Sequence, residues 1–371
     1  MNELDLALKY EPVLLFSKDD KGREESFFPV STAHYVAESA LHEKGVGVVK
    51  ARTALSLDDL AATSPGKSQD LYLTFAADKI LDHDPSFMDR LAHGGLALFS
   101  VEGSMSTQLV VEDEAGIAAA EEDPALERSP DADDLDSAFS FSGPGEEEPP
   151  ADVSFVLTDA MQLPDKIHRA ALERYGRYAE FSKYPPMYYY STLYNRGYHV
   201  LQYWFFYAYN DWGTGHGGVN DHEGDWEMIA LFFRDNKPQY IAYSAHTGGP
   251  EYYPWDASEV HKVDGTHPVV YVGCGSHANY FHSTTHEMFS FKDFAFGNSD
   301  MSIGPGTSVP WGKPADLRAQ SWALNYAGGW GAMVKRFGSS SLAPGAQSPV
   351  SPPWQFPRWE SPTGWAKIPL P

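Results

Sequence analysis

The chain has 371 residues, which is enough for one large or two ordinary domains with a sizeable core. Its net charge of −24 argues against nucleic acid as a partner and does not support association with anionic membranes. More than half of this charge lies in residues 111–150, which contain fourteen acidic residues and one arginine, a net charge of −13. The rest of the chain is only mildly acidic, so its charge says little about the folded part.

Three features bear on the compartment. Cys274 is the only cysteine, so no intrachain disulfide can form, which favours a reducing compartment. The N-terminus lacks the basic and apolar regions of a signal peptide, and no stretch of about 18 uncharged apolar residues predicts a membrane-spanning helix. We therefore expect a cytoplasmic protein, or a secreted one if a signal peptide has been trimmed from it.

The first part of the chain, residues 1–110, consists of short predicted elements. We expect it to form the N-terminal part of a single β-rich domain and to act as a scaffold, with Phe27 and Phe28 packed on a later sheet. None of its residues has the spacing of a catalytic motif. The expected helices are residues 2–10, 31–41 and 85–92, and the expected strands are residues 12–16, 46–51, 71–75 and 96–101.

Residues 111–151 differ in composition from the rest of the chain. They combine the acidic run with five prolines and patches rich in serine, glycine and aspartate. Such a composition buries too little apolar surface to order itself, so it predicts a disordered insertion or linker. The alternative function is an acidic tether for a basic partner.

Residues 152–371 carry the main strand signals. Many short apolar runs separated by glycine, proline and asparagine predict a mainly β fold, an antiparallel β-sandwich decorated with a few helices. From about Phe289 onward, proline, glycine and tryptophan predict a long C-terminal wrap around the core, or else an aromatic-lined pocket for a ring-shaped or cationic ligand. The expected elements are a helix over residues 165–180 and strands over residues 197–209, 228–233, 238–245 and 268–273.

The segment of residues 210–233, NDWGTGHGGVNDHEGDWEMIALFF, places four groups with metal-binding chemistry within six positions. Strand alternation puts Asp225 and Glu227 on the same side, where two carboxylates repel each other unless a cation lies between them. A divalent cation with oxygen ligands would satisfy both, and His222 could add a nitrogen ligand. The alternative is a polar strand face of hydrogen-bonded acids.

Two further histidines follow apolar strands at glycine-containing turns. His246 and His277 occupy positions that suit a pocket, because glycine lets a ligand or backbone approach closely. Combined with His222, Asp225 and Glu227, they would form a set of imidazoles and carboxylates that suits Zn, Mn, Fe or Mg. There is no G-x-S-x-G motif, no G-x-G-x-x-G in a Rossmann context and no P-loop, so the sequence gives no support to a serine hydrolase or to nucleotide chemistry.

Several motifs together resemble the family named for vacuolar protein sorting-associated protein 62. The resemblance covers most of the chain apart from the acidic insertion, and the late Trp-Gly and Ser-Pro elements are similar too. The motifs that carry it are Glu11-Pro12-Val13, Phe27 to Ser31 (FFPVS), Tyr203 to Tyr207 (YWFFY), His222 to Glu227 (HEGDWE), His267 to Tyr271 (HPVVY) and Gly275 to Phe281 (GSHANYF).

The same HEGDWE motif is similar to the H-x-x-D-W-E core of the necrosis- and ethylene-inducing peptide-like cytolysins. That family's β-sandwich holds a divalent cation, so the resemblance implies that His222, Asp225 and Glu227 face a metal, with Asp211 as the counterpart of a further upstream aspartate. The identity of the cation stays open among Mg, Ca, Mn, Zn and Fe. The cytolysins also use a disulfide and a signal peptide, and this sequence shows neither.

Three hypotheses about function remain open. The first is a metal-dependent enzyme, a hydrolase or a lyase/cyclase, that acts on a small or lipid-like molecule. The cation would serve as Lewis acid or water activator, with Glu223, His246 or His277 as the base. The second is a cytolysin-like module that binds a lipid or glycan with the help of the metal. The third is a structural protein in which a metal or polar cluster ties strands together.

Overall fold

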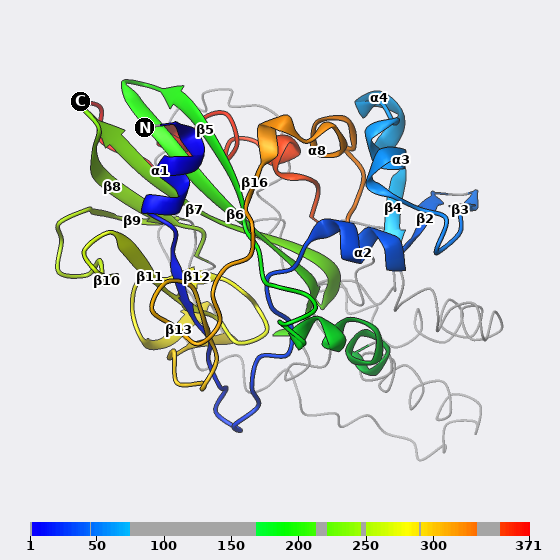
Figure 1. Ribbon diagram of the computed structural model, residues 1–371, viewed down its shortest axis with the longest axis horizontal. Coiled ribbons are helices and arrows are strands. Elements are labelled where there is room, and N and C mark those ends of the chain that lie inside the picture. The colour runs from blue at the N-terminus through cyan, green and yellow to red at the C-terminus, as the bar shows by residue number, and fades with distance from the viewer. Residues whose placement is uncertain are drawn as a thin grey trace, which may run out of the picture.

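The computed structural model describes residues 2–44, 46–74, 168–212, 221–245, 250–288, 291–331 and 349–371, and its centre is a six-stranded sheet (Figure 1). Neighbouring strands are antiparallel except for the pair β16–β5, which is parallel. The strands lie in the order β16 (Ala315–Asp316), β5 (Tyr189–Asn195), β6 (Tyr198–Asn210), β7 (His222–Arg234), β8 (Lys237–Tyr243) and β9 (Glu251–Pro254).

The two longest strands, β6 and β7, are buried on both faces. In β6, Trp204 and Phe206 join one hydrophobic core, whereas Phe205 and Tyr207 join a second core. Because successive strand residues point to opposite faces, these two cores lie on the two sides of the sheet. The uninterrupted aromatic run of β6 thus reflects a sheet that is covered on both faces.

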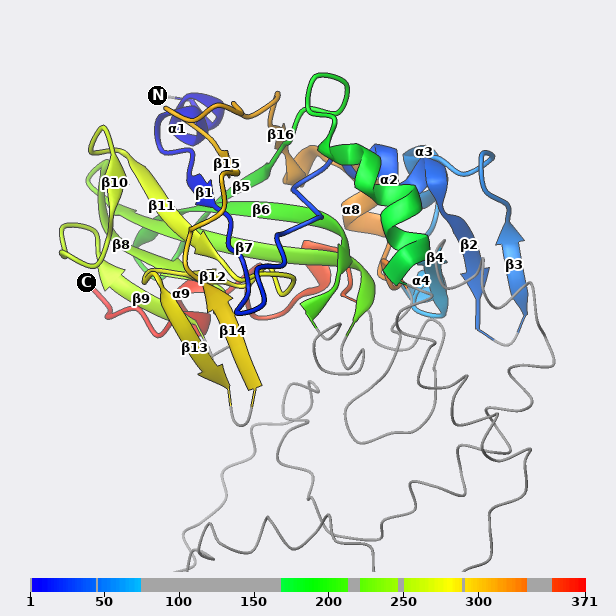
Figure 2. The ribbon, with the colours of Figure 1, turned by 90° about the horizontal axis from the view of Figure 1, so that it is seen from below.

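A second sheet covers one face of the central sheet (Figure 2). Its strand β1 is parallel to β11 and antiparallel to β15, so it joins the N-terminal segment to two late segments of the chain. A separate hairpin, β13 (Thr284–Met288) with β14 (Phe291–Ala295), projects beside it. The second sheet consists of β10 (Lys262–Val263), β11 (His267–Val272), β1 (Val13–Leu15) and β15 (Ser302–Ile303), with β12 (Asn279–Tyr280) paired to β11.

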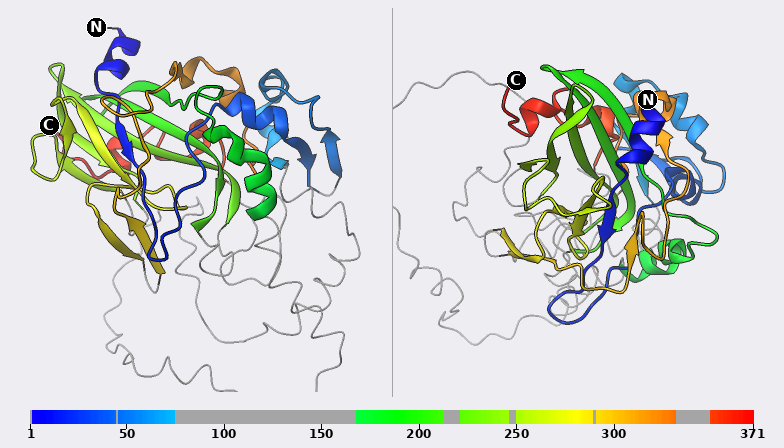
Figure 3. Two further views of the ribbon diagram at one scale, coloured as in Figure 1. Left: turned by 60° about the horizontal axis from the view of Figure 1, so that its bottom comes forward. Right: turned by 60° about the vertical axis from the view of Figure 1, so that its left-hand side comes forward.

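Helices and a small sheet cover the opposite face (Figure 3). The small sheet has the strand order β3 (Gly47–Lys50), β2 (Ala40–Glu43), β4 (Leu71–Thr74), and residues 168–175 form a helix that ends in the 3-10 turn η4 (Gly176–Ala179). The other helical elements are α1 (Glu3–Lys9), α2 (Thr32–Glu38), α3 (Leu57–Ala61), α4 (Pro65–Ser68), η6 (Leu317–Ala319), α8 (Ser321–Asn325), η7 (Pro352–Trp354) and α9 (Pro362–Trp365).

The mainly β, sandwich-like fold is confirmed, and so are most of the expected strands. Phe27 and Phe28 do pack on the central sheet, one in each core. The sequence did not reveal α3, α4, α8 and α9, because helices of four or five residues are too short to show a 3.6-residue period. The parallel pairs β1–β11 and β16–β5 were not expected either.

Some expected features lie outside the described residues, namely the helix over 85–92, the strand over 96–101 and the insertion over 111–151. Each hydrophobic core combines residues from before position 75 with residues from after position 168. The division of the chain into residues 1–110, 111–151 and 152–371 stays a prediction. No helix in the described ranges is long and apolar enough to span a membrane.

Gly224 in β7 provides a test of the packing between the sheet and the C-terminal segment. Its φ is +66°, and an added Cβ would lie 2.4 Å from the carbonyl oxygen of Trp330. We expect Gly224→Ala to lower the free energy of unfolding by about 2–4 kcal/mol, from backbone strain and overpacking together. Urea denaturation followed by fluorescence would measure it.

Gly66 in α4 is the matched control, because an added Cβ there meets no atom within 4 Å. Gly66→Ala should leave stability unchanged or raise it slightly. An equal loss of stability in both variants would contradict the close approach of β7 to Trp330.

Candidate functional site

The candidate site lies where β6 ends and β7 begins. The strand pairing places Asp225 opposite Tyr207 and Glu223 opposite Tyr209. Gly224 separates the two acids and adopts a left-handed conformation, which interrupts the regular alternation of the strand. As a result, Asp225 and Glu223 have different surroundings, although their spacing alone would put them on the same side.

Asp225 is held in a fixed orientation. Its Oδ2 accepts hydrogen bonds from Asn210 Nδ2 (3.0 Å) and His277 Nδ1 (2.9 Å), and its Oδ1 lies 3.5 Å from His222 Nε2. Burial alone would raise the pKa of Asp225, but the hydrogen bonds and charges of His222 and His277 hold it well below its usual range. Asp225 is therefore a buried carboxylate that remains ionised.

His277 is completely buried between two carboxylates. Its Nδ1 donates to Asp225, its Nε2 lies 3.5 Å from Glu25 Oε1, and its ring stacks on Tyr207 at 3.8 Å between centroids. Burial alone would lower the pKa of His277, but the negative charges of Glu25 and Asp225 raise it to about 10. The imidazole is therefore protonated near neutral pH, and it serves as a donor and cation instead of a base.

Glu25 joins the N-terminal segment to the loop that carries His277. Its Oε1 accepts from the backbone N–H of Ser26 (2.8 Å) and Phe27 (2.9 Å), and its Oε2 accepts from that of Gly275 (2.8 Å). The buried thiol of Cys274 in the same loop lies 3.5 Å from a backbone oxygen of the N-terminal segment, and burial raises its pKa. Glu25 could not be predicted as part of the site, because 200 residues separate it from Asp225.

Glu227 lies further along β7. It accepts a hydrogen bond from the Ser244 hydroxyl, whose oxygen in turn accepts from the side chain of Asn279 (3.2 Å). Burial raises the pKa of Tyr207, and the charges of Glu25, Glu227 and Asp225 raise it further. Within the described part of the chain the buried Tyr207 hydroxyl has no hydrogen-bond partner.

Asp211 has its own basic partners, Arg23 and His168. Its Oδ2 lies 3.1 Å from Arg23 Nη1 and 3.2 Å from His168 Nε2, and its backbone N–H donates to Gly275 at 3.1 Å. Burial opposes ionisation, yet the hydrogen bond from His168 and the charge of Arg23 lower the pKa of Asp211. Asp211 thus borders the His277 loop while its carboxylate is engaged with Arg23 and His168.

The structure therefore brings some of the predicted residues together and separates others. His222, Asp225 and His277 are in direct contact, and Glu227 is close to them beside Tyr207. Glu223 instead accepts hydrogen bonds from the hydroxyls of Thr74 and Tyr175, on the face covered by helices. His246 lies outside the described residues.

The spacing of His222 and Asp225 is close to that of neighbouring metal ligands. Ligand atoms that are each about 2.1 Å from one ion lie roughly 3.0–3.4 Å from each other, and His222 Nε2 lies slightly farther from Asp225 Oδ1, at 3.5 Å. The other oxygen of Asp225 is fixed by Asn210 and His277, as the hydrogen-bonded carboxylates of metal sites are. The described ranges contain no group of three His, Cys, Asp or Glu side chains already arranged around a metal position.

The chain is thus a β-rich protein with a buried acid–histidine site, and comparisons with known proteins give short matches to it. No family model matches the chain. Over 95 residues it is 34% identical to vacuolar protein sorting-associated protein 62 of Saccharomyces cerevisiae, a match that covers 22% of this chain and 20% of that protein. The chain therefore spans about a fifth of the length of this curated relative.

Among solved structures, the matches are proteins of the necrosis- and ethylene-inducing group. Necrosis and Ethylene inducing Protein 2, from the causal agent of cocoa's Witches Broom disease, is 19% identical with a TM-score of 0.21, covering 29% of this chain and 50% of that one. NLPPya in complex with glucosamine is 13% identical with a TM-score of 0.25, covering 37% and 55%.

The His277 ion pair makes stability depend on pH. The folded pKa of about 10 lies above the ordinary value of about 6.5. Its stabilisation is therefore complete below pH 6.5 and is lost as the pH rises through 10. We expect the free energy of unfolding, measured with a chelator present, to fall by a few kcal/mol between pH 6.5 and 10.

His277→Asn should remove most of this dependence on pH, and asparagine tolerates the φ of +59° at this position. His261→Asn, at an exposed position, should keep the wild-type profile. Identical slopes for wild type and His277→Asn would contradict a protonated His277 in the core.

Proposed function

We propose that this protein is a binding module in which a divalent cation, held by His222 and Asp225 with Glu227 as a further ligand, contacts the bound molecule. The observation that carries the proposal is the spacing of His222 Nε2 and Asp225 Oδ1, together with the fixation of the second Asp225 oxygen. Mixed nitrogen and oxygen donors suit Zn, Mn or Fe more than Ca or Mg.

Binding is favoured over catalysis because of the placement of the expected bases. His277 directs Nδ1 at Asp225 and Nε2 at Glu25, so both ring nitrogens face carboxylates and neither faces an open coordination position. Glu223 is engaged with the hydroxyls of Tyr175 and Thr74. Neither His277 nor Glu223 is therefore placed as a general base, and the third expected base, His246, lies outside the described residues.

The ligand class follows from charge. A cation with open coordination positions takes oxygen atoms from a ligand, which sugar hydroxyls or the phosphate of a lipid head group can supply. The site itself contains the carboxylates Asp225, Glu227 and Glu25, which disfavour an anionic head group more than an uncharged sugar. A neutral glycan is therefore the favoured ligand, and its ring hydroxyls would complete the coordination of the cation.

Elemental analysis of protein purified without added metal or chelator tests the cation site. We expect about one equivalent of a divalent metal in wild type. Asp225→Asn should lose it, because the amide supplies no negative charge. Glu38→Gln is the matched control, since Glu38 is an ion-paired carboxylate on the helix-covered side, next to Arg174 and Arg177, and it should retain the metal.

Glycan-array binding with the metal present and after chelation then tests the ligand. Binding that disappears on chelation and in Asp225→Asn, but not in Glu38→Gln, is the expected result. The absence of metal from wild type, or equal metal in wild type and Asp225→Asn, would overturn the cation site and leave a hydrogen-bonded polar cluster that ties strands together.

A further inference from the structure

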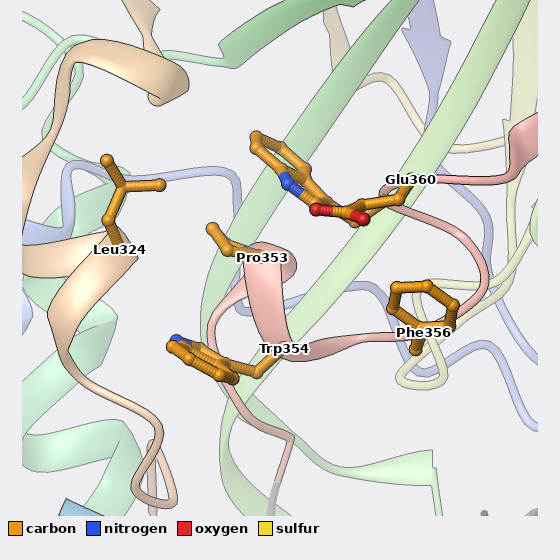
Figure 4. Close-up of a pocket in the computed structure, with 6 residues that line it drawn as sticks. Leu324, Pro353, Trp354, Phe356 and Glu360 are labelled. Atoms are coloured by element: carbon orange, nitrogen blue, oxygen red, sulfur yellow. The ribbon is translucent and has the colours of Figure 1, made fainter. Parts of the chain in front are cut away.

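A second candidate site lies in the C-terminal segment, among residues that take no part in the acid–histidine site. It is a hollow of about 380 Å³ between the end of α8, η7 and the turn that follows η7 (Figure 4). Phe356 at its edge is 54% exposed, which is unusual for so large an apolar side chain. The residues that line it are Leu324, Pro353, Trp354, Phe356, Trp359 and Glu360.

The hollow contains one charged group, and that group is an acid. Glu360 is the only ionisable residue among the six that line it. The indole N–H of Trp354 is already donated to the backbone oxygen of Ala323 (3.2 Å). The hollow therefore offers ring faces and one negatively charged acceptor, which suits a cation and repels an anion.

The structure already contains one cation on a ring of this hollow. The guanidinium of Arg318 lies 4.3 Å from the centroid of Trp359, although Arg318 is not among the lining residues. The negative charges of Glu360 and Asp316 both act on Arg318, so Arg318 neutralises Glu360 only in part. Glu360 can thus still attract a second cation that enters the hollow.

We propose that this hollow binds an alkylated ammonium group of the choline type, with the rings of Trp354 and Phe356 beside the methyl groups and Glu360 as counter-charge. A quaternary ammonium donates no hydrogen bond, so it requires only what this hollow provides, namely aromatic faces and a negative charge. The group could belong to free choline or to the head group of a lipid. This inference does not depend on the cation site at Asp225.

Choline chloride is the probe, and its binding to the full chain is followed by saturation-transfer NMR and by the indole N–H signals. The key comparison is 3,3-dimethylbutanol, which has the same shape with a carbon atom in place of the charged nitrogen. We expect choline to bind at least about tenfold more tightly than this neutral analogue. Equal affinity for the two compounds, or no binding of choline, would overturn the proposal.

Variants at Phe356 distinguish the effect of its aromatic face from the effect of its apolar volume. Phe356→Leu should weaken choline binding about threefold to tenfold, whereas Phe356→Tyr, which keeps an aromatic face, should retain it. Glu360→Gln should weaken binding of choline and not that of the neutral analogue. Tyr194→Leu removes an exposed aromatic ring outside the hollow (84% exposed) and should have no effect. Retention of full affinity in both Phe356→Leu and Glu360→Gln would overturn the assignment.

Vesicles of phosphatidylcholine identify the source of the group. Cosedimentation of wild type, but not of Glu360→Gln, would assign the hollow to a lipid head group. Binding of free choline without binding to vesicles would assign it to a small solute.

Discussion

The protonated His277 between Asp225 and Glu25 is the interaction on which the site depends. It joins three segments that are far apart in sequence: the stretch after β1, the start of β7 and the loop after β11. Two buried carboxylates and one buried imidazolium are stable only as a set, because removal of one member leaves an uncompensated charge. The contact with His277 fixes the orientation of Asp225, so the buried core determines the geometry of the candidate cation site.

The strands that could be predicted are those marked by a run of apolar residues within a single segment. The long apolar runs that became β6, β7, β8 and β11 were expected as strands, and the flanking glycine and proline residues indicated their ends. The small helices and the parallel pairing of β1 with β11 were not expected. Both depend on contacts with distant segments, and the spacing of apolar residues within one segment does not indicate such contacts.

The site could be predicted in part, for the same reason. His222, Asp225 and Glu227 are close in sequence, and the distance between the first two suits a shared cation. The sequence places Glu223 beside these residues. Gly224 adopts a left-handed conformation, however, and Glu223 therefore accepts a hydrogen bond from Tyr175 instead. Glu25 and Tyr207 carried no signal, because their roles exist only once β1, β6 and the His277 loop have come together.

The buried Cys274 has a consequence for how the loop can be observed. Its thiol is the only one in the chain, it lies three residues before His277, and burial keeps it in the unreactive protonated form. A thiol reagent can therefore modify the protein only when this loop moves away from the N-terminal segment. The rate at which the Cys274 thiol is labelled therefore measures how often this loop opens, and no engineered cysteine is needed.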